Sequence, residues 1–87
     1  MPVFSIKALG GIFEPATIEV PADTRFKIEI ENVGTDPIEF ESSELRLEKV
    51  LAGGAKSYVV INGLKPGTYM FFDDFHPNTG QVHVVVK

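Results

Sequence analysis

The sequence predicts an all-β fold, a Greek-key sandwich of about seven or eight strands formed by one domain of 87 residues. Two observations predict this architecture. Apolar and charged residues alternate along much of the chain, which is the period-2 pattern of strands with one buried face. Clusters of Gly, Pro, Asn and Asp interrupt the alternation and leave segments of roughly five to eight residues, a length typical of β-sandwiches.

The first half of the chain contains three predicted strands. Residues 3–8 form the first strand and residues 12–20 form the second. Pro15 lies inside the second strand and marks it as an edge or kinked strand, because proline has no N–H to donate to a neighbouring strand. Residues 25–31 alternate most regularly, with aromatic and aliphatic side chains on one face and charged side chains on the other.

Residues 42–51 are the ambiguous segment of the second half. Ser43 could cap a helical turn, whereas Leu45 and Leu47 fit the alternation of a strand. We therefore expect a short turn followed by a strand. The later predicted strands are residues 57–61, 69–72 and 81–86, and the predicted core comprises Phe26, Ile28, Ile30, Val59, Tyr69, Phe71, Val82 and Val84.

Composition and charge exclude several classes of function. The net charge of −4 argues against a nucleic-acid partner, which needs clustered Lys and Arg. No apolar run approaches the ~20 residues of a membrane-spanning helix, so we expect no direct membrane insertion. The chain has no cysteine and gives no signal of redox compartment. It begins almost inside its first strand, as expected either of a cytosolic protein or of a mature domain without its leader.

The segment 67–82 contains the residues best suited to chemistry. It is predicted to form a strand, a polar loop with two carboxylates and a histidine, and a closing strand. If the strand is regular, Asp73 shares the inner face with Tyr69 and Phe71. An inward carboxylate is costly unless it meets a cation or several hydrogen-bond donors. Asp73 is therefore expected either to bind a metal ion or to cap the loop.

Two histidines have different prospects. His76 follows Asp73 by three residues in a carboxylate-rich loop, so it is a metal ligand, a surface residue or a hydrogen-bond partner. His83 alternates with Val82 and Val84 and should face solvent on the last strand.

A second acidic segment includes Glu39 and Glu41, which share one face of a strand with Phe40 on the opposite face. The default interpretation of such a pair is a solvated surface. The two carboxylates would join a site only if this strand end lies beside the loop of Asp73 and His76. No Ser/His/Asp set, cysteine nucleophile, phosphate loop or basic aromatic patch is recognisable, so we do not expect an enzyme.

Several segments resemble a known family. Residues 13–22, 26–32 and 64–71 are similar to the cupredoxin-like domain pattern. The Phe40-Glu41-Ser42 and Phe75-His76-Pro77 motifs are similar to those of small periplasmic cupredoxin-like proteins found with bacterial iron permeases. The resemblance implies a cupredoxin-like sandwich in the periplasm that binds a metal ion, iron or copper, as an accessory to a membrane iron permease.

Blue-copper members of this family bind the metal through two histidines, a cysteine and usually a methionine. Carried over by position, the first histidine falls on Glu39, the cysteine on Asp73 and the second histidine on His76, and Gly80 stands near the place of the methionine. The resemblance therefore implies that this chain lacks a type 1 blue-copper centre, whose electron transfer depends on the thiolate.

An oxygen-rich ligand set with one imidazole suits Fe, Mn, Zn or Cu(II). The alternative is a metal-free interaction module that docks to a permease or a multidomain partner through a loop end or an exposed strand edge. The candidate metal ligands are Glu39, Asp73, Asp74 and His76, with Glu41 and Glu44 as acidic surroundings.

Overall fold

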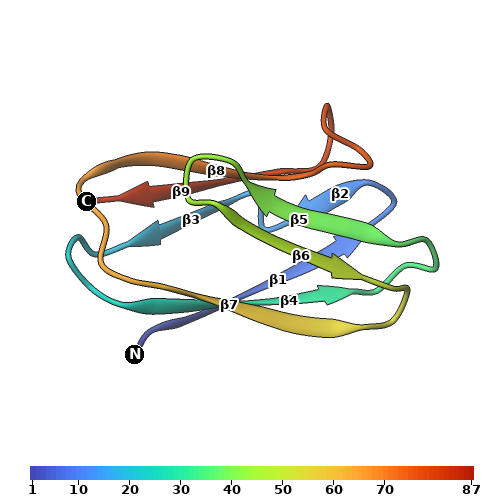
Figure 1. The fold of residues 1–87 in the computed structure, drawn as a ribbon, viewed down its shortest axis with the longest axis horizontal. Helices are drawn as coiled ribbons and strands as arrows, with labels where there is room; N and C mark the ends of the chain where they lie inside the picture. Colours follow the sequence, from blue (N-terminus) through green and yellow to red (C-terminus); the bar gives the residue numbers. More distant parts are fainter.

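The structure of the chain is a computed structural model that describes residues 1–87, and it consists of nine β-strands in two sheets that pack face to face (Figure 1). This arrangement confirms the predicted all-β sandwich. No helix with the length and hydropathy needed to span a bilayer occurs in it. The strands are β1 (Val3–Leu9), β2 (Ile12–Glu14), β3 (Thr17–Val20), β4 (Phe26–Asn32), β5 (Ile38–Ser42), β6 (Leu47–Leu51), β7 (Lys56–Ile61), β8 (Gly67–Asp73) and β9 (Gln81–Val86).

The two sheets mix parallel and antiparallel pairs. The first sheet has the order β2-β1-β4-β7, and the second has the order β3-β9-β8-β5-β6. The pairs β1–β4 and β3–β9 are parallel, whereas all other neighbours are antiparallel. Strands that are adjacent in a sheet are therefore often distant in sequence, as in a Greek key.

Pro15 explains why the structure has nine strands rather than the expected seven or eight. The peptide bond between Glu14 and Pro15 is cis, and the predicted strand of residues 12–20 divides there. β2 pairs with β1 in the first sheet, and β3 pairs with β9 in the second. Both are edge strands, as the position of the proline predicts.

Seventeen buried hydrophobic residues form the core between the sheets. Seven of the eight predicted core residues are buried, and Tyr69 is the half-buried exception. Its hydroxyl donates a hydrogen bond to the Lys65 carbonyl oxygen at 2.9 Å, so its polar tip stays at the surface. Three aromatic rings occupy the centre: Phe40 stacks on Phe71 at 4.5 Å and meets the edge of Phe13 at 5.4 Å between ring centroids.

The segment 42–51 forms a turn and then a strand, as expected. The Ser42 hydroxyl oxygen accepts a hydrogen bond from the Leu45 N–H at 3.4 Å, and the Arg46 N–H donates to the Ser43 carbonyl oxygen at 3.3 Å. Arg46 adopts a positive φ of 56°, which ends the turn before β6 begins.

Four loops meet at one end of the sandwich, which we call the loop end. They join β1 to β2, β4 to β5, β6 to β7 and β8 to β9, and they lie together at the right of Figure 1. The Thr79 hydroxyl of the β8–β9 loop donates to the Gly11 carbonyl oxygen of the β1–β2 loop at 2.7 Å. This bond links the ends of the two sheets.

We expect Ile28→Asp to prevent folding, because Ile28 is fully buried in the middle of β4 and an unpaired carboxylate there costs several kcal/mol. Circular dichroism and a dispersed NMR spectrum report the folded state. Thr68→Asp, on an exposed position of β8, is the matched control and should remain folded. A cooperative thermal transition in Ile28→Asp would contradict the assignment of the core.

Candidate metal centre

Asp73 points into the protein at the end of β8. The alternation that buries Phe71 continues to Asp73, which is only 1% exposed. Its Oδ1 accepts hydrogen bonds from the backbone N–H groups of Glu39 at 3.1 Å and Phe75 at 3.0 Å. The inward orientation is therefore confirmed, and hydrogen-bond donors offset the cost of burying the carboxylate without a cation.

His76 supplies the third hydrogen bond to this carboxylate. Its Nδ1 lies 2.9 Å from Oδ2 of Asp73. The imidazole packs against Gly11, whose φ is +77° and where an added Cβ would lie 3.0 Å from the ring. A neutral imidazole that donates from Nδ1 keeps the lone pair of Nε2 available. The side chain is 41% exposed, so solutes can reach this ring.

The backbone of the β8–β9 loop closes around these two side chains. The Asp73 N–H donates to the Gly80 carbonyl oxygen at 2.8 Å, and the Gly80 N–H donates to the His76 carbonyl oxygen at 2.9 Å. An added Cβ at Gly80 would lie 2.7 Å from the Asp73 Cβ, so the loop needs glycine at this position.

Three other carboxylates gather on the outer face of the second sheet. One oxygen from each of Glu39, Glu41 and Asp74 lies within 4.8 Å of the others, and we call this group the acidic cluster. Glu48 is the cross-strand partner of Glu41 and adds a fourth negative charge beside it.

The neighbouring carboxylates change the titration of Glu39. Its pKa is raised from 4.5 to about 7, chiefly by a hydrogen bond to the Glu41 side chain. Desolvation and the negative charges of Glu48 and Asp74 raise it further. The cluster therefore carries unneutralised negative charge that a bound cation would relieve.

The pleat of the sheet separates the predicted ligands. Asp73 and Asp74 are consecutive residues, so their side chains point to opposite faces of the sheet. Asp73 and His76 lie at the end of the core, whereas Asp74 joins Glu39 and Glu41 outside. The fifth acidic candidate, Glu44, accepts a hydrogen bond from the Met70 N–H at 2.8 Å and is not part of the acidic cluster.

The six predicted ligands are therefore divided among three places. Asp73 and His76 lie at the end of the core, the acidic cluster lies on the outer face, and Glu44 lies beside Met70. Metal binding by any of them stays a prediction. His83 is exposed on β9, as expected.

The residues do not fit a type 1 copper centre. The chain contains no cysteine. The side chain of Glu39 belongs to the outer face, and both oxygens of Asp73 are already hydrogen-bonded. The space beside Gly80 is filled by the Asp73 Cβ, so no longer side chain fits there.

Asn32 is a buried polar residue of structural importance at the loop end, and no motif of the sequence singles it out. It is 1% exposed, and its Nδ2 donates to the carbonyl oxygens of Asp36 at 2.8 Å, Leu51 at 3.3 Å and Ala52 at 3.2 Å. These bonds fasten the β4–β5 loop to the β6–β7 loop. The alternation along β4 indicates that Asn32 is buried, because its side chain lies on the same face of the strand as Phe26, Ile28 and Ile30.

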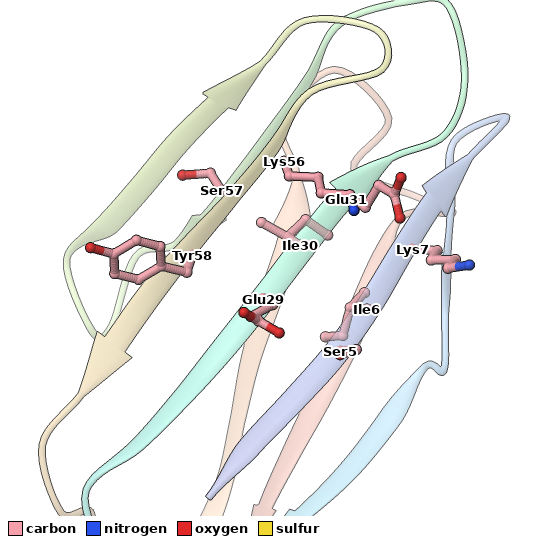
Figure 2. Close-up of a pocket in the computed structure, with 9 residues that line it drawn as sticks. All are labelled: Ser5, Ile6, Lys7, Glu29, Ile30, Glu31, Lys56, Ser57 and Tyr58. Atoms are coloured by element: carbon pink, nitrogen blue, oxygen red, sulfur yellow. The ribbon is translucent and has the colours of Figure 1, made fainter. Parts of the chain in front are cut away.

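One hollow of the surface lies away from both groups of ligands. It measures about 340 Å³ and crosses the outer face of β1, β4 and β7 (Figure 2). Lys7, Glu31 and Lys56 are paired by register in one row across it. Glu29 also lines the hollow, so two negative charges accompany two positive charges and no charge of one sign is concentrated there.

Comparison with known proteins places the chain in a family. It matches the Cupredoxin-like domain over residues 1–86. The chain belongs to the cupredoxin-like domain family. An uncharacterized protein of Rickettsia prowazekii (strain Madrid E) is 36% identical over 75 residues, which is 86% of this chain and 60% of that relative's length. The family resemblance that the sequence suggests is therefore confirmed.

Solved cupredoxin structures share the fold. Reduced auracyanin from Roseiflexus castenholzii superposes with a TM-score of 0.79 at 14% identity, over 100% of this chain and 98% of that one. The purple cupredoxin from Nitrosopumilus maritimus gives 0.68 at 18% identity, over 97% and 99%. The metal-binding domain of the Cu(I)-exporting ATPase CopA from Streptococcus pneumoniae, solved with Cu(I), gives 0.85 at 14% identity, over 98% and 84%.

We expect Asp73→Ala to lower the free energy of unfolding by about 3 kcal/mol, because it leaves two backbone N–H groups and an imidazole without their acceptor. Urea unfolding at pH 7 measures the loss. Asp36→Ala is the matched control: it removes an exposed carboxylate that makes no hydrogen bond or ion pair, and it should change stability by less than about 0.5 kcal/mol. Equal stabilities of the two variants would show that the buried carboxylate is not a structural anchor.

The raised pKa of Glu39 predicts a pH-dependent stability. The folded protein retains a proton that the unfolded protein releases between pH 4.5 and about 7, so stability decreases as the pH rises through this range. Glu39→Gln should therefore raise the thermal midpoint at pH 8 and leave it nearly unchanged at pH 4. Glu14→Gln, outside the acidic cluster, should show no such trend. A constant difference between wild type and Glu39→Gln from pH 4 to pH 8 would exclude the charge crowding.

Proposed function

We propose that this chain is a metal-binding accessory domain for iron or copper handling, and that it binds a divalent cation at the acidic cluster. The observation that supports this most directly is the convergence of oxygens from Glu39, Glu41 and Asp74 within 4.8 Å on a face where their charges are not neutralised. Three carboxylates with water in the remaining positions suit hard and borderline cations.

Family membership supports a metal-related role. Auracyanin and the purple cupredoxin share the fold, and so does the metal-binding domain of CopA, which was solved with Cu(I). This chain differs because its donors are oxygens and imidazole rather than thiolate. Iron(II) and manganese(II) therefore suit the cluster by ligand type, whereas copper(II) gains from its generally higher affinity for any such site.

The cellular setting of the proposal rests on the sequence resemblance. The Phe40-Glu41-Ser42 and Phe75-His76-Pro77 motifs are similar to those of periplasmic proteins found with bacterial iron permeases. We propose a periplasmic location and a membrane iron permease as the partner that receives the cation or delivers it. The role is one of binding and transfer, without catalysis.

Calorimetric titration with Mn(II), Zn(II), Cu(II) and, without oxygen, Fe(II) tests the proposal. We expect Glu39→Gln and Asp74→Asn each to weaken binding at this cluster at least tenfold, because each removes one of three charged ligands. Cu(II) should produce no intense visible charge-transfer band, since no thiolate is present. Glu29→Gln, on the other sheet, is the matched control and should bind as wild type does.

Binding no tighter than about millimolar, which corresponds to about −4 kcal/mol, would overturn the metal proposal. The second candidate, a metal-free interaction module, would then take its place. It is favoured by apolar side chains exposed at the loop end, namely Leu9 at 61%, Ile12 at 56%, Val33 at 42% and Phe75 at 50%.

A further inference from the structure

His83 and Met70 face each other on the outer face of the second sheet. They are cross-strand partners in the antiparallel pair of β9 and β8, which lie side by side (Figure 1). The buried residues Phe71, Val82 and Val84 alternate with them, so both side chains point away from the core. His83 is exposed and Met70 is 36% exposed, so an ion in solution can reach both.

Two hydrogen bonds of the backbone show that these side chains are close to each other. The His83 N–H donates to the Ala16 carbonyl oxygen at 2.8 Å. The Met70 N–H donates to Oε1 of Glu44, also at 2.8 Å. Neither N–H points at the opposite residue, so this is a non-hydrogen-bonded pair of the antiparallel ladder. The Cα atoms of such a pair are about 4.5 Å apart, and its side chains lie closer than those of a hydrogen-bonded pair.

The donor atoms of both side chains are free. The His83 imidazole makes no hydrogen bond or ion pair within the protein, in contrast to that of His76. A neutral imidazole offers one nitrogen lone pair to a ligand. The thioether sulfur of Met70 is only a weak hydrogen-bond acceptor, so water competes poorly with a soft cation for it. One small ion can therefore contact a nitrogen and a sulfur without a change in the backbone.

The surroundings of the pair favour a cation. The residues in the two neighbouring rows of β8 and β9 are uncharged: Thr68, Phe72, Gln81 and Val85. Thr17, the partner of His83 on β3, is uncharged as well. The Glu44 carboxylate is held beside the main chain of Met70 by its hydrogen bond and adds a negative charge there. No Lys or Arg of these strand rows opposes a cation.

We propose that the His83 imidazole and the Met70 thioether together bind a soft monovalent cation of the Cu(I) class on this face. A thioether selects Cu(I) over harder ions, and imidazole also suits copper. The two residues do not stand at the positions of the blue-copper ligands, which fall on Glu39, Asp73 and His76. The site therefore combines sulfur and nitrogen on the strands themselves rather than in the β8–β9 loop.

This site is separate from the acidic cluster, although both lie on the outer face of the second sheet. Along β8 and its continuation, Phe72 stands between Met70 and Asp74, and it is in register with Glu41 of the cluster. The two sites share no ligand. They also differ in chemistry, because carboxylates suit hard and borderline divalent ions whereas a thioether suits a soft ion. A soft probe therefore tests the pair, and Mn(II) tests the cluster.

NMR gives a sharp test, because the chain has two methionines and two histidines. The probe is one equivalent of Ag(I), a redox-inert soft ion with the charge of Cu(I). The protein is labelled with carbon-13 at the methionine methyl groups and with nitrogen-15 in the imidazoles. We expect the signals of Met70 and His83 to shift and those of Met1 and His76 to stay in place. Shifts at His76 with none at His83 would overturn the proposal.

Met70→Leu keeps an apolar side chain of similar size and removes the sulfur, so it should weaken Ag(I) binding at His83 at least tenfold. His83→Gln should abolish the shift of Met70. Cu(I), added without oxygen in competition with a chromophoric chelator, should give the same order of affinities. Val50→Leu, at an exposed apolar position of β6 in the same sheet, is the matched control and should bind Ag(I) as wild type does.

Mn(II) separates this proposal from the one for the acidic cluster. Its affinity, whatever the value, should be the same in wild type, Met70→Leu and His83→Gln, because neither substitution removes a carboxylate. Failure of Mn(II) to bind would therefore leave the result with Ag(I) unaffected. Equal affinities of wild type and Met70→Leu for Ag(I) would overturn the proposed pair.

Discussion

The loop end depends on one buried carboxylate. Asp73 lies where a charge is very costly unless several donors surround it, and three donors from three different places do so: the first turn of its own loop, the start of β5 and the imidazole of His76. Satisfying this group therefore fixes β5 against β8 and closes the β8–β9 loop at the same time. The ring of His76 is oriented as a by-product of that requirement.

The pleat of the second sheet then determines which polar side chains can lie together on one face. A strand presents consecutive side chains to opposite faces, so Asp73, which ends β8, and Asp74, which follows it, have different surroundings. The acidic cluster lies on the outer face, whereas the imidazole of His76 and the carboxylate of Asp73 lie at the end of the core. In this cupredoxin-like chain, which lacks cysteine, the residues at the positions of the blue-copper ligands therefore lie on different faces: Glu39 outside, and Asp73 and His76 at the end of the core.

Those parts of the fold were predictable for which a local residue pattern is enough to identify a strand and its buried face. The alternation of Phe26, Ile28 and Ile30 identifies a core strand, and the same parity places Asp73 inside. Pro15 predicts an edge strand. Local patterns of this kind do not depend on which strands become neighbours.

The composition of the candidate site was less predictable, because it depends on register between distant segments. The contact of Asp73 with the Glu39 backbone spans 34 residues, and the hydrogen bond of Thr79 with Gly11 spans 68. The separation of the acidic cluster from His76 follows from this register.

The division of the segment 12–20 at Pro15 also determines how the sandwich is closed. β2 and β3 are edge strands of different sheets and follow each other directly in the chain, and β6 and β7 are the other two edges and are likewise consecutive. Each open side of the sandwich is thus joined covalently from sheet to sheet, and its edges are only three to six residues long. Short, tethered edges resist the addition of a foreign strand. The short, tethered edges of both sheets therefore disfavour edge-to-edge aggregation of the molecule.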